Sequence, residues 1–287
     1  MKPENLLLRS MLFVPGHNRR YLQNAFASHA DALIIDLEDS VPFAAKQEAR
    51  DIAAVWMQKH KFPGSVFVRL NDADSGLMET DIDSFLPLPI TGFIISKVSS
   101  PQEVEAVDAL LINTSLTLIP LIETAAAILN LPAICRASSR IVAAALGAED
   151  FITSLGGTYS PTGANLLVAR TQLVLAARAA GILPIDTLHI RVHDLDELAR
   201  DCGVARELGF EGMLCLHPKE LPIIHHHFSP NPEEIRQAQA MIAQSQVISK
   251  EGKQVAMVKG TFVGPPLVRR AQVLLKKAAL IAAREQL

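Results

Sequence analysis

The feature that most constrains the fold is a regular alternation of short apolar runs with segments of helical pattern. Eight apolar runs recur in the first 216 residues, and their interiors lack the polar alternation of a half-exposed strand. Continuous runs of this kind are typical of buried parallel strands, which need helical crossover connections between them. The runs cover residues 9–14, 32–39, 65–70, 92–97, 118–124, 143–150, 184–189 and 212–216.

The number of strand–helix units predicts the architecture. Eight units in roughly 215 residues favour a (β/α)8 TIM barrel, in the α/β class. The alternative is a doubly wound open sheet, which usually carries a phosphate loop, but neither G-x-G-x-x-G nor G-x-x-x-x-G-K-[ST] is present. Helices are expected over 19–28, 42–56, 101–111, 164–180 and 194–208, with an irregular stretch after Asp150 and a solvated turn at 225–227.

The last part of the chain reads as an extension of the barrel. We assign residues 1–229 to the barrel and 230–287 to a C-terminal helical and hairpin extension. A polar helix over 232–249, a hairpin over 255–263 and a helix over 267–285 are expected there, the last one opened by the proline pair at 265–266.

Composition excludes several classes of function. The net charge of −3 and the 5% aromatic content argue against a nucleic-acid partner. No apolar run approaches the roughly 20 residues of a membrane span. Three cysteines, an odd number without metal-ligand spacing, favour reduced thiols and a cytoplasmic location.

Polar side chains gather where the predicted strands end. In a TIM barrel the active site lies at the carboxyl ends of the strands, so this accumulation favours a site over chance. The residues are Asp36, Glu38, Asp39, Arg69, Asn71, Lys97, Glu123, Glu149, Asp150 and His217.

Two consecutive strands end in acids that suit a metal ion. Glu123 closes one run, and Glu149 and Asp150 close the next. Neighbouring strands lie about 4.8 Å apart, so the two ends can share one hard cation. Mg²⁺ typically takes one or two protein carboxylates. The alternative is that these acids only cap the helices that follow.

The basic residues have both functional and structural interpretations. Arg69 suits an anion clamp, because guanidinium grips a carboxylate bidentately; the alternative is an ion pair with Asp36 or Glu38. Lys97 can neutralise an acid or an enolate. Lys46 and Arg50 lie four residues apart and suit a phosphate, or form a solvated helix face. His217, before Pro218, is interpreted as fixing a loop.

Several segments, in the same order along the chain, resemble the citrate lyase β-subunit-like family. This family is related to malyl-CoA and citramalyl-CoA lyases of the HpcH/HpaI aldolase superfamily. The resemblance covers nearly the whole chain, and its motifs are specific as a set. The matching segments are 9–16, 36–41, Lys46 with Arg50, 68–71, 97–98, 121–124, 147–151 and 216–218.

The resemblance implies a role for individual residues. It implies Glu123 and Asp150 as Mg²⁺ ligands and Arg69 as the binder of the substrate carboxylate. The backbone amides near Ala148 and Glu149 would hold the oxo-acid carboxylate. Asp36 and Glu38 would support Arg69 and the metal water. Arg19, Lys46 and Arg50 are weaker candidates for the coenzyme A phosphates.

The resemblance also implies a reaction and an assembly. A 3-hydroxyacyl-CoA thioester of the citramalyl-CoA or malyl-CoA type would be cleaved to acetyl-CoA and a 2-oxo acid. A homo-oligomer, often a trimer or hexamer, is implied, with the extension packing on a neighbouring subunit.

The sequence leaves other functions open. One is a citrate lyase β subunit that acts with an acyl-carrier partner, and another is an aldolase on free oxo acids. Many relatives carry an aspartate where this chain has Gly264, which motivates a non-catalytic oxo-acid binder.

Overall fold

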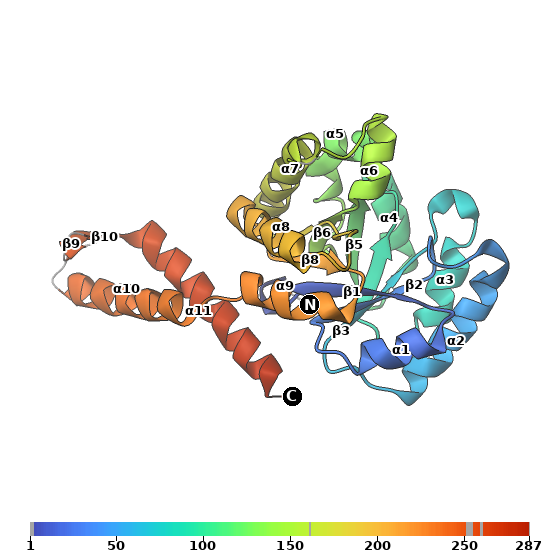
Figure 1. Ribbon diagram of the computed structural model, residues 1–287, viewed down its shortest axis with the longest axis horizontal. Coiled ribbons are helices and arrows are strands. Elements are labelled where there is room, and N and C mark those ends of the chain that lie inside the picture. The colour runs from blue at the N-terminus through green and yellow to red at the C-terminus, as the bar shows by residue number, and fades with distance from the viewer. Residues whose placement is uncertain (1–2, 161, 251–254, 259–260, 287) are drawn as a thin grey trace. The chain divides into compact units, whose positions relative to one another are not determined.

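Eight parallel strands close into a barrel in the computed structural model, which describes residues 3–160, 162–250, 255–258 and 261–286 (Figure 1). Each strand pairs with its neighbours in sequence, and the last pairs with the first. The barrel prediction is therefore confirmed, and the doubly wound alternative is wrong. The strands are β1 Ser10–Pro15, β2 Ala32–Asp36, β3 Ser65–Arg69, β4 Gly92–Ile95, β5 Thr117–Ile122, β6 Ala143–Leu146, β7 Leu183–Asp186 and β8 Gly212–Cys215.

The seam between β1 and β8 closes the barrel. Ser10 is in register with Met213, and Leu12 with Cys215. The backbones approach closely at Gly212, where an added Cβ would lie 1.8 Å from the carbonyl oxygen of Leu8. Glycine is therefore required at the point where the first and last strands meet.

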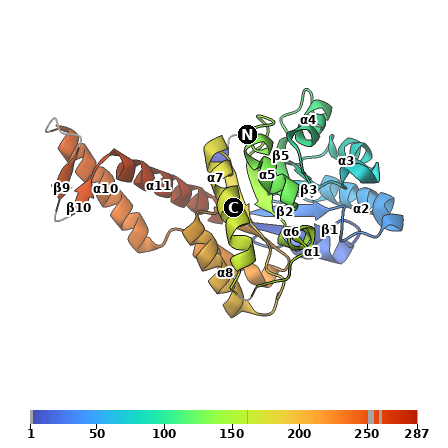
Figure 2. The ribbon, with the colours of Figure 1, turned by 90° about the horizontal axis from the view of Figure 1, so that it is seen from above.

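Helices surround the strands on the outside of the barrel (Figures 1 and 2). Side-chain caps begin several of them: the side chains of Asn18, Thr124 and Asp194 accept first-turn amides of α1, α5 and α8. The helices are η1 Pro3–Asn5, α1 Arg19–Phe26, η2 Phe43–Ala45, α2 Lys46–Lys59, η3 Ala73–Ser75, α3 Met78–Phe85, α4 Pro101–Leu110, α5 Ala125–Ile134, α6 Ala148–Leu155, α7 Ala164–Ala180, α8 Leu195–Leu208, η4 Pro218–Glu220 and α9 Leu221–Phe228.

Three helices differ from the sequence-based expectations. The sequence reading assigned no helix to 78–85, where the structure has α3. The expected irregular stretch after Asp150 is wrong, because β6 ends at Leu146 and α6 begins at Ala148. The solvated turn expected at the three histidines is also wrong: they lie in α9, and His225 accepts or donates a 2.8 Å hydrogen bond with Ser10.

The interior of the barrel is filled by strand side chains. Phe67, Ile94, Ile119 and Leu214 are at most 1% exposed and belong to one contiguous cluster. The strands are therefore buried on both faces, against this cluster inside and the helices outside. This double burial explains why the sequence reads as continuous apolar runs rather than alternating ones.

The chain divides into two compact units, Met1–His226 and His227–Leu287. The second contains α10 Pro232–Lys250, the antiparallel pair β9 Ala256–Val258 and β10 Thr261–Val263, and α11 Pro265–Glu285. The predicted hairpin and helices are confirmed; residues 259 and 260 of that hairpin lie outside the described residues. α10 and α11 pack on each other.

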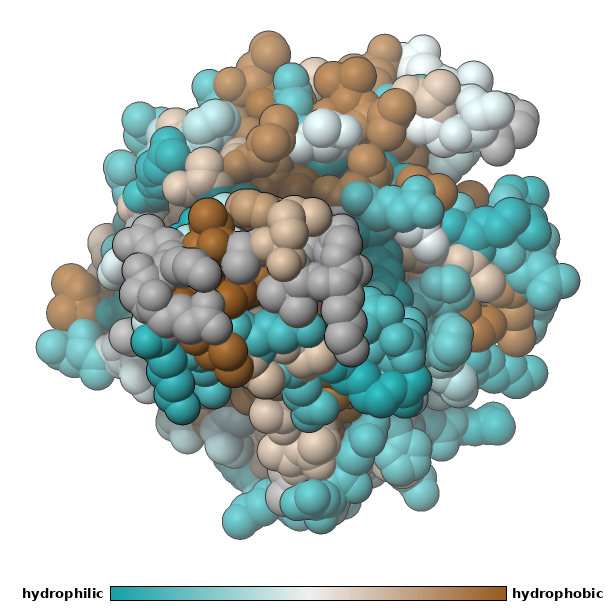
Figure 3. Space-filling model, turned by 90° about the vertical axis from the view of Figure 1, so that its left-hand side faces the viewer, coloured by the Kyte–Doolittle hydropathy of each residue, from teal (hydrophilic) through white to brown (hydrophobic). Residues whose placement is uncertain are grey.

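The hairpin end of the second unit exposes apolar side chains. Val255, Met257 and Phe262 are 49%, 66% and 47% exposed. Figure 3 shows apolar surface here, beside the residues drawn in grey. Gly264 precedes α11 in extended conformation, and an added Cβ would lie 2.7 Å from the Phe262 ring.

Within the described ranges, no helix has the length and apolar character needed to cross a bilayer.

Candidate functional site

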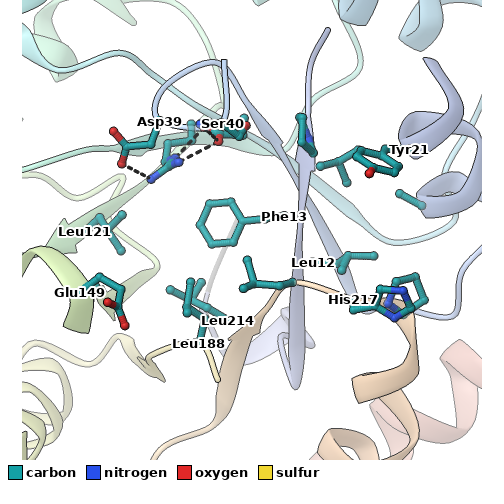
Figure 4. Close-up of a pocket in the computed structure, with 18 of the residues that line it drawn as sticks. Leu12, Phe13, Tyr21, Asp39, Ser40, Leu121, Glu149, Leu188, Leu214 and His217 are labelled. Atoms are coloured by element: carbon teal, nitrogen blue, oxygen red, sulfur yellow. Dashed lines mark hydrogen bonds and ion pairs between the residues drawn. The ribbon is translucent and has the colours of Figure 1, made fainter. Parts of the chain in front are cut away.

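A cavity of about 1000 Å³ opens at the carboxyl ends of the strands, where TIM barrels place their active sites. Figure 4 shows Phe13 between a polar rim, with Asp39 and Ser40, and an apolar floor, with Leu188 and Leu214. The cavity is thus polar on one side and apolar at its base. Such a combination suits a small ligand with an acidic group and an apolar substituent.

An arginine held by three acids forms the polar rim. Arg69, at the end of β3, donates from Nε and Nη2 to the two carboxylate oxygens of Asp36, both at 2.7 Å. Its Nη1 lies 2.9 Å from Glu38 and 3.5 Å from Asp39. Guanidinium has five N–H donors, so these four contacts leave one N–H, on Nη2, for a further anion. Both sequence interpretations of Arg69 are therefore compatible: it is ion-paired, and it lines the cavity.

Burial and the arginine act in opposite directions on these acids. Burial raises the pKa of Asp36, but the charge and hydrogen bonds of Arg69 outweigh it and hold this pKa below its usual value. For Glu38 burial prevails over the attraction of Arg69, and the pKa is raised. Asp36 is thus a fixed anion that orients Arg69.

Glu123, just after β5, is a buried acid with no ion pair to a basic side chain among the described residues. Its side chain is almost fully buried, and Oε2 accepts the backbone N–H of Lys97 at 2.9 Å. Burial raises the pKa of Glu123 to about 8; the Lys97 amide and the charge of Arg69 act in the opposite direction, whereas repulsion from Glu38 and Asp150 adds to the effect of burial. A carboxylate in this state is favourable only when a cation neutralises it.

Gly147 provides the space that Glu123 occupies. It lies between β6 and α6, and an added Cβ would lie 2.4 Å from Oε1 and 2.5 Å from Cγ of Glu123. Both atoms are too close for any larger residue to coexist with this rotamer. The glycine and the Lys97 amide therefore fix the Glu123 carboxylate from two sides.

The start of α6 brings two more acids to the cavity. Glu149 and Asp150 lie in its first turn and line the cavity, and no side chain caps the helix at Gly147. The backbone amide of Ala148 donates a 3.1 Å hydrogen bond to Thr187 Oγ1, so this N–H already has an acceptor. The Tyr159 hydroxyl donates to the Glu149 carboxylate. The amide of Glu149 remains as an anion donor at the helix N-terminus.

The donor set fits a hard divalent cation. Two carboxylates, Glu123 and Asp150, face one cavity and repel each other. Within the described part of the chain no group of three or more His, Cys, Asp or Glu could hold a metal ion. Two carboxylates with open positions match Mg²⁺, which keeps water and substrate ligands, better than a fully enclosed metal site.

The basic residues proposed for phosphates lie in different settings. Arg19 is exposed at the start of α1. Lys46 Nζ donates to the carbonyl oxygens of Leu37 and Glu38, both at 2.7 Å, and so holds the loop after β2. Arg50 is 4% exposed and pairs with the buried Asp81 at 2.7 Å. Arg19 is the most accessible of the three.

His217 fixes the turn after β8, as the sequence suggested. Its Nδ1 accepts the N–H of Lys219 at 3.1 Å, and Glu220 completes a capping box. It also lines the cavity, opposite Asp39 in Figure 4. The sequence reasoning missed the roles of Phe13, Gly147 and Thr187, although a glycine that directly follows a strand, two residues before an acid pair, is a detectable signal.

Comparisons with known proteins agree with this geometry. The family model described as HpcH/HpaI aldolase/citrate lyase matches residues 9–218. The citrate lyase subunit beta of Haemophilus influenzae is 30% identical over 95% of this chain and 97% of its own length. The mitochondrial citramalyl-CoA lyase of Rattus norvegicus is also 30% identical, over 95% and 86%.

A solved structure is similar along nearly the whole chain. It is the protein CitE from Mycobacterium tuberculosis in complex with magnesium, acetoacetate and coenzyme A. The TM-score is 0.80 at 26% identity, over 96% of this chain and 99% of that one.

Proposed function

Since the chain belongs to the HpcH/HpaI aldolase/citrate lyase family, we propose that it is a Mg²⁺-dependent carbon–carbon lyase. Its substrate is a 3-hydroxyacyl-CoA thioester of the citramalyl-CoA or malyl-CoA type, and its products are acetyl-CoA and a 2-oxo acid. The observation that carries this proposal is the buried Glu123, whose pKa is raised to about 8, in the same cavity as Asp150 and Arg69.

The metal ligands in this proposal are Glu123 and Asp150. When bound, Mg²⁺ supplies Lewis-acid polarisation of the hydroxyl and nascent carbonyl oxygen. The protein fixes the ligand geometry through the Lys97 amide and Gly147. The structural relative crystallised with magnesium is consistent with this assignment.

Arg69 binds the carboxylate of the oxo-acid part. Asp36 holds the guanidinium plane bidentately, so Arg69 enters the complex already oriented. The Glu149 amide at the start of α6 is a second donor to this carboxylate. Glu38, which pairs with both Arg69 and Lys97, completes the charged support.

The apolar floor favours a small substituent on the substrate carbon. Phe13, Leu121, Leu188 and Leu214 offer no partner for a second carboxylate. A methyl group or hydrogen, as in citramalyl-CoA and malyl-CoA, is compatible with this floor, whereas the extra carboxylate of a citryl group would be desolvated. Arg19 is the favoured contact for coenzyme A phosphates, with Lys46 and Arg50 contributing through the structure of the loop and helix.

Three alternatives differ from this proposal in substrate or in turnover, and Gly264 motivates the non-catalytic one. As a citrate lyase β subunit, which is the name of the Haemophilus influenzae relative, the protein would act on a citryl-acyl-carrier thioester. As a non-catalytic homologue, it would bind Mg²⁺ and oxo acid without turnover. A third function is that of an aldolase on free oxo acids, which needs no coenzyme A.

The C-terminal unit and the cysteines suggest the protein's setting. We propose that residues 230–287 pack on a neighbouring subunit of a trimer or hexamer through the exposed hairpin side chains. Cys135, Cys202 and Cys215 are buried and free, and burial raises their pKa values, which is consistent with inert thiols in the cytoplasm.

The deciding assay follows acetyl-CoA and oxo-acid release from citramalyl-CoA, malyl-CoA and citryl-CoA, with Mg²⁺ and with EDTA. Metal-dependent cleavage of citramalyl-CoA or malyl-CoA is expected. Absence of turnover on all three, with pyruvate still bound, would favour the carrier-dependent or non-catalytic alternative.

Substitution of the clamp should weaken oxo-acid binding. For Arg69→Lys we expect roughly hundredfold weaker pyruvate binding at saturating Mg²⁺, because ammonium cannot hold Asp36 and the ligand in one plane. Calorimetry measures the affinity, and circular dichroism checks folding. An unchanged pyruvate affinity in a folded variant would count against Arg69 as the clamp.

Magnesium affinity should depend on pH through Glu123. Since its pKa is raised to about 8, the metal displaces a proton below that pH, and the affinity should rise roughly tenfold per pH unit up to about 8. The free energy of unfolding of the metal-free protein should change with pH in the opposite direction. Ionising Glu123 costs more in the folded than in the unfolded state, so this free energy falls as pH rises from about 4.5 to 8. Calorimetry and thermal melts at several pH values test both trends.

A further inference from the structure

Lys97 has a backbone conformation that its residue type disfavours. It follows β4 with φ at 53°, in the left-handed region. Asn113 is the one other non-glycine residue with positive φ within the described residues, and asparagine tolerates this region well. A strained lysine beside a site suggests that the site requires this conformation, because glycine would adopt it without cost.

The two ends of Lys97 contact different acids of the candidate site. Its backbone N–H donates to Glu123 Oε2 at 2.9 Å, toward β5. Its Nζ lies 2.7 Å from Glu38 Oε1, on the segment after β2, and 3.5 Å from Asp39. Glu38 in turn contacts Arg69 Nη1 at 2.9 Å. One residue therefore links the metal carboxylate to the anion clamp.

The side-chain charge also acts on the metal side. Burial lowers the pKa of Lys97, but attraction by Glu38, Asp39 and Asp150 outweighs it and raises the pKa above its usual value. The ammonium lies among Glu38, Asp39 and Asp72, at 2.7, 3.5 and 3.8 Å, close to the proposed metal site. The positive charge of the Lys97 side chain would repel a divalent cation at this site, whereas the Lys97 backbone amide holds Glu123, a proposed ligand of that cation.

We propose that Lys97 is a positioning residue with two separable actions: its amide fixes Glu123 for the metal, and its ammonium fixes Glu38 and, through it, Arg69 for the oxo acid. This inference rests on the proposed function. It goes further in predicting that backbone and side chain of one residue change two affinities independently.

Two substitutions separate the actions. Lys97→Met removes the charge and keeps the backbone, so we expect unchanged or tighter Mg²⁺ binding and about tenfold weaker pyruvate binding at saturating Mg²⁺. Lys97→Val also removes the charge, but a β-branched residue resists positive φ, so Mg²⁺ binding should weaken about tenfold or more. Lys97→Arg keeps a cation and should restore pyruvate binding to within about threefold of wild type.

Calorimetry with Mg²⁺ alone, and with pyruvate at saturating Mg²⁺, gives both affinities without turnover. Equal Mg²⁺ affinities in folded Lys97→Met and Lys97→Val would overturn the inference while leaving the proposed function intact. No Mg²⁺ binding by the wild type would overturn both.

A second measurement does not depend on the folding of the valine variant. In protein labelled with ¹⁵N-lysine, the amide resonance of Lys97, assigned by its loss in Lys97→Arg, should move as Mg²⁺ is added. A resonance that is unaffected at saturating Mg²⁺ would exclude the amide from the metal site.

Discussion

Glu123→Ala is expected to weaken Mg²⁺ binding by more than about a hundredfold and to abolish metal-dependent cleavage. The reason is that the variant removes one of the two proposed carboxylate ligands, and the described residues contain no group of three or more His, Cys, Asp or Glu that could hold a metal ion instead. Asp150→Ala should have the same effect on turnover. Calorimetry with Mg²⁺ and the citramalyl-CoA assay measure the two losses.

Although Glu123→Ala should lose Mg²⁺ affinity, its stability without metal should be equal to or higher than that of the wild type at high pH. Above about pH 8 the wild type carries an ionised, buried Glu123 whose raised pKa reports an unfavourable charge. Alanine removes this cost, so the metal-free variant should melt at the same or a higher temperature than wild type at pH 9. Glu105→Ala, an exposed acid on α4, is the control for general loss of negative charge. Wild-type Mg²⁺ affinity in Glu123→Ala would exclude the assigned site.

Gly147→Ala is expected to be nearly as damaging, although it adds only one methyl group. The added Cβ would lie 2.4 Å from Oε1 of Glu123, so either the carboxylate or the start of α6 must move. We expect Mg²⁺ affinity to fall at least about tenfold, with roughly 1–3 kcal/mol lost from the free energy of unfolding by overpacking. Mg²⁺ calorimetry and chemical denaturation measure these effects.

A matched control and a double variant test the cause. In Gly157→Ala the new Cβ has its nearest neighbours at 3.9 Å, so affinity and stability should remain close to wild type. In Glu123→Ala/Gly147→Ala the clash is absent, and the stability lost in Gly147→Ala should largely return. Additive losses in the double variant would show that Gly147 acts on something other than Glu123.

The strands could be predicted because double burial leaves a direct trace in sequence. Continuous apolar runs identified all eight, and caps such as Asn18 and Asp194 located the helix starts. The short α6 was missed because it begins only one glycine after β6, so strand and helix read as one run. Such an abrupt strand-to-helix turn depends on tertiary packing rather than on local pattern.

The charged members of the candidate site could be predicted for a related reason. Arg69 and Glu123 interrupt apolar sequence where a strand ends, and a parallel barrel gathers such ends on one face. The contacts that position Glu123 were not predictable from sequence. Gly147 lies 24 residues after Glu123 and Lys97 lies 26 residues before it, and only the fold brings the Gly147 backbone and the Lys97 N–H to its carboxylate. The left-handed φ of Lys97 could not be predicted either, because lysine usually avoids this conformation and nothing in the residue type marks it.

The seam between β1 and β8 has a consequence for how the protein is made. About 200 residues separate the paired strands, and synthesis proceeds from the N-terminus at about 5–20 residues per second. The growing chain therefore holds an unpaired edge at β1 until Gly212–Cys215 has left the ribosome. Phe13 and Leu214, on these two strands, meet in the cavity floor only after closure, so a chain released earlier would carry Glu123 and Asp150 without a completed pocket.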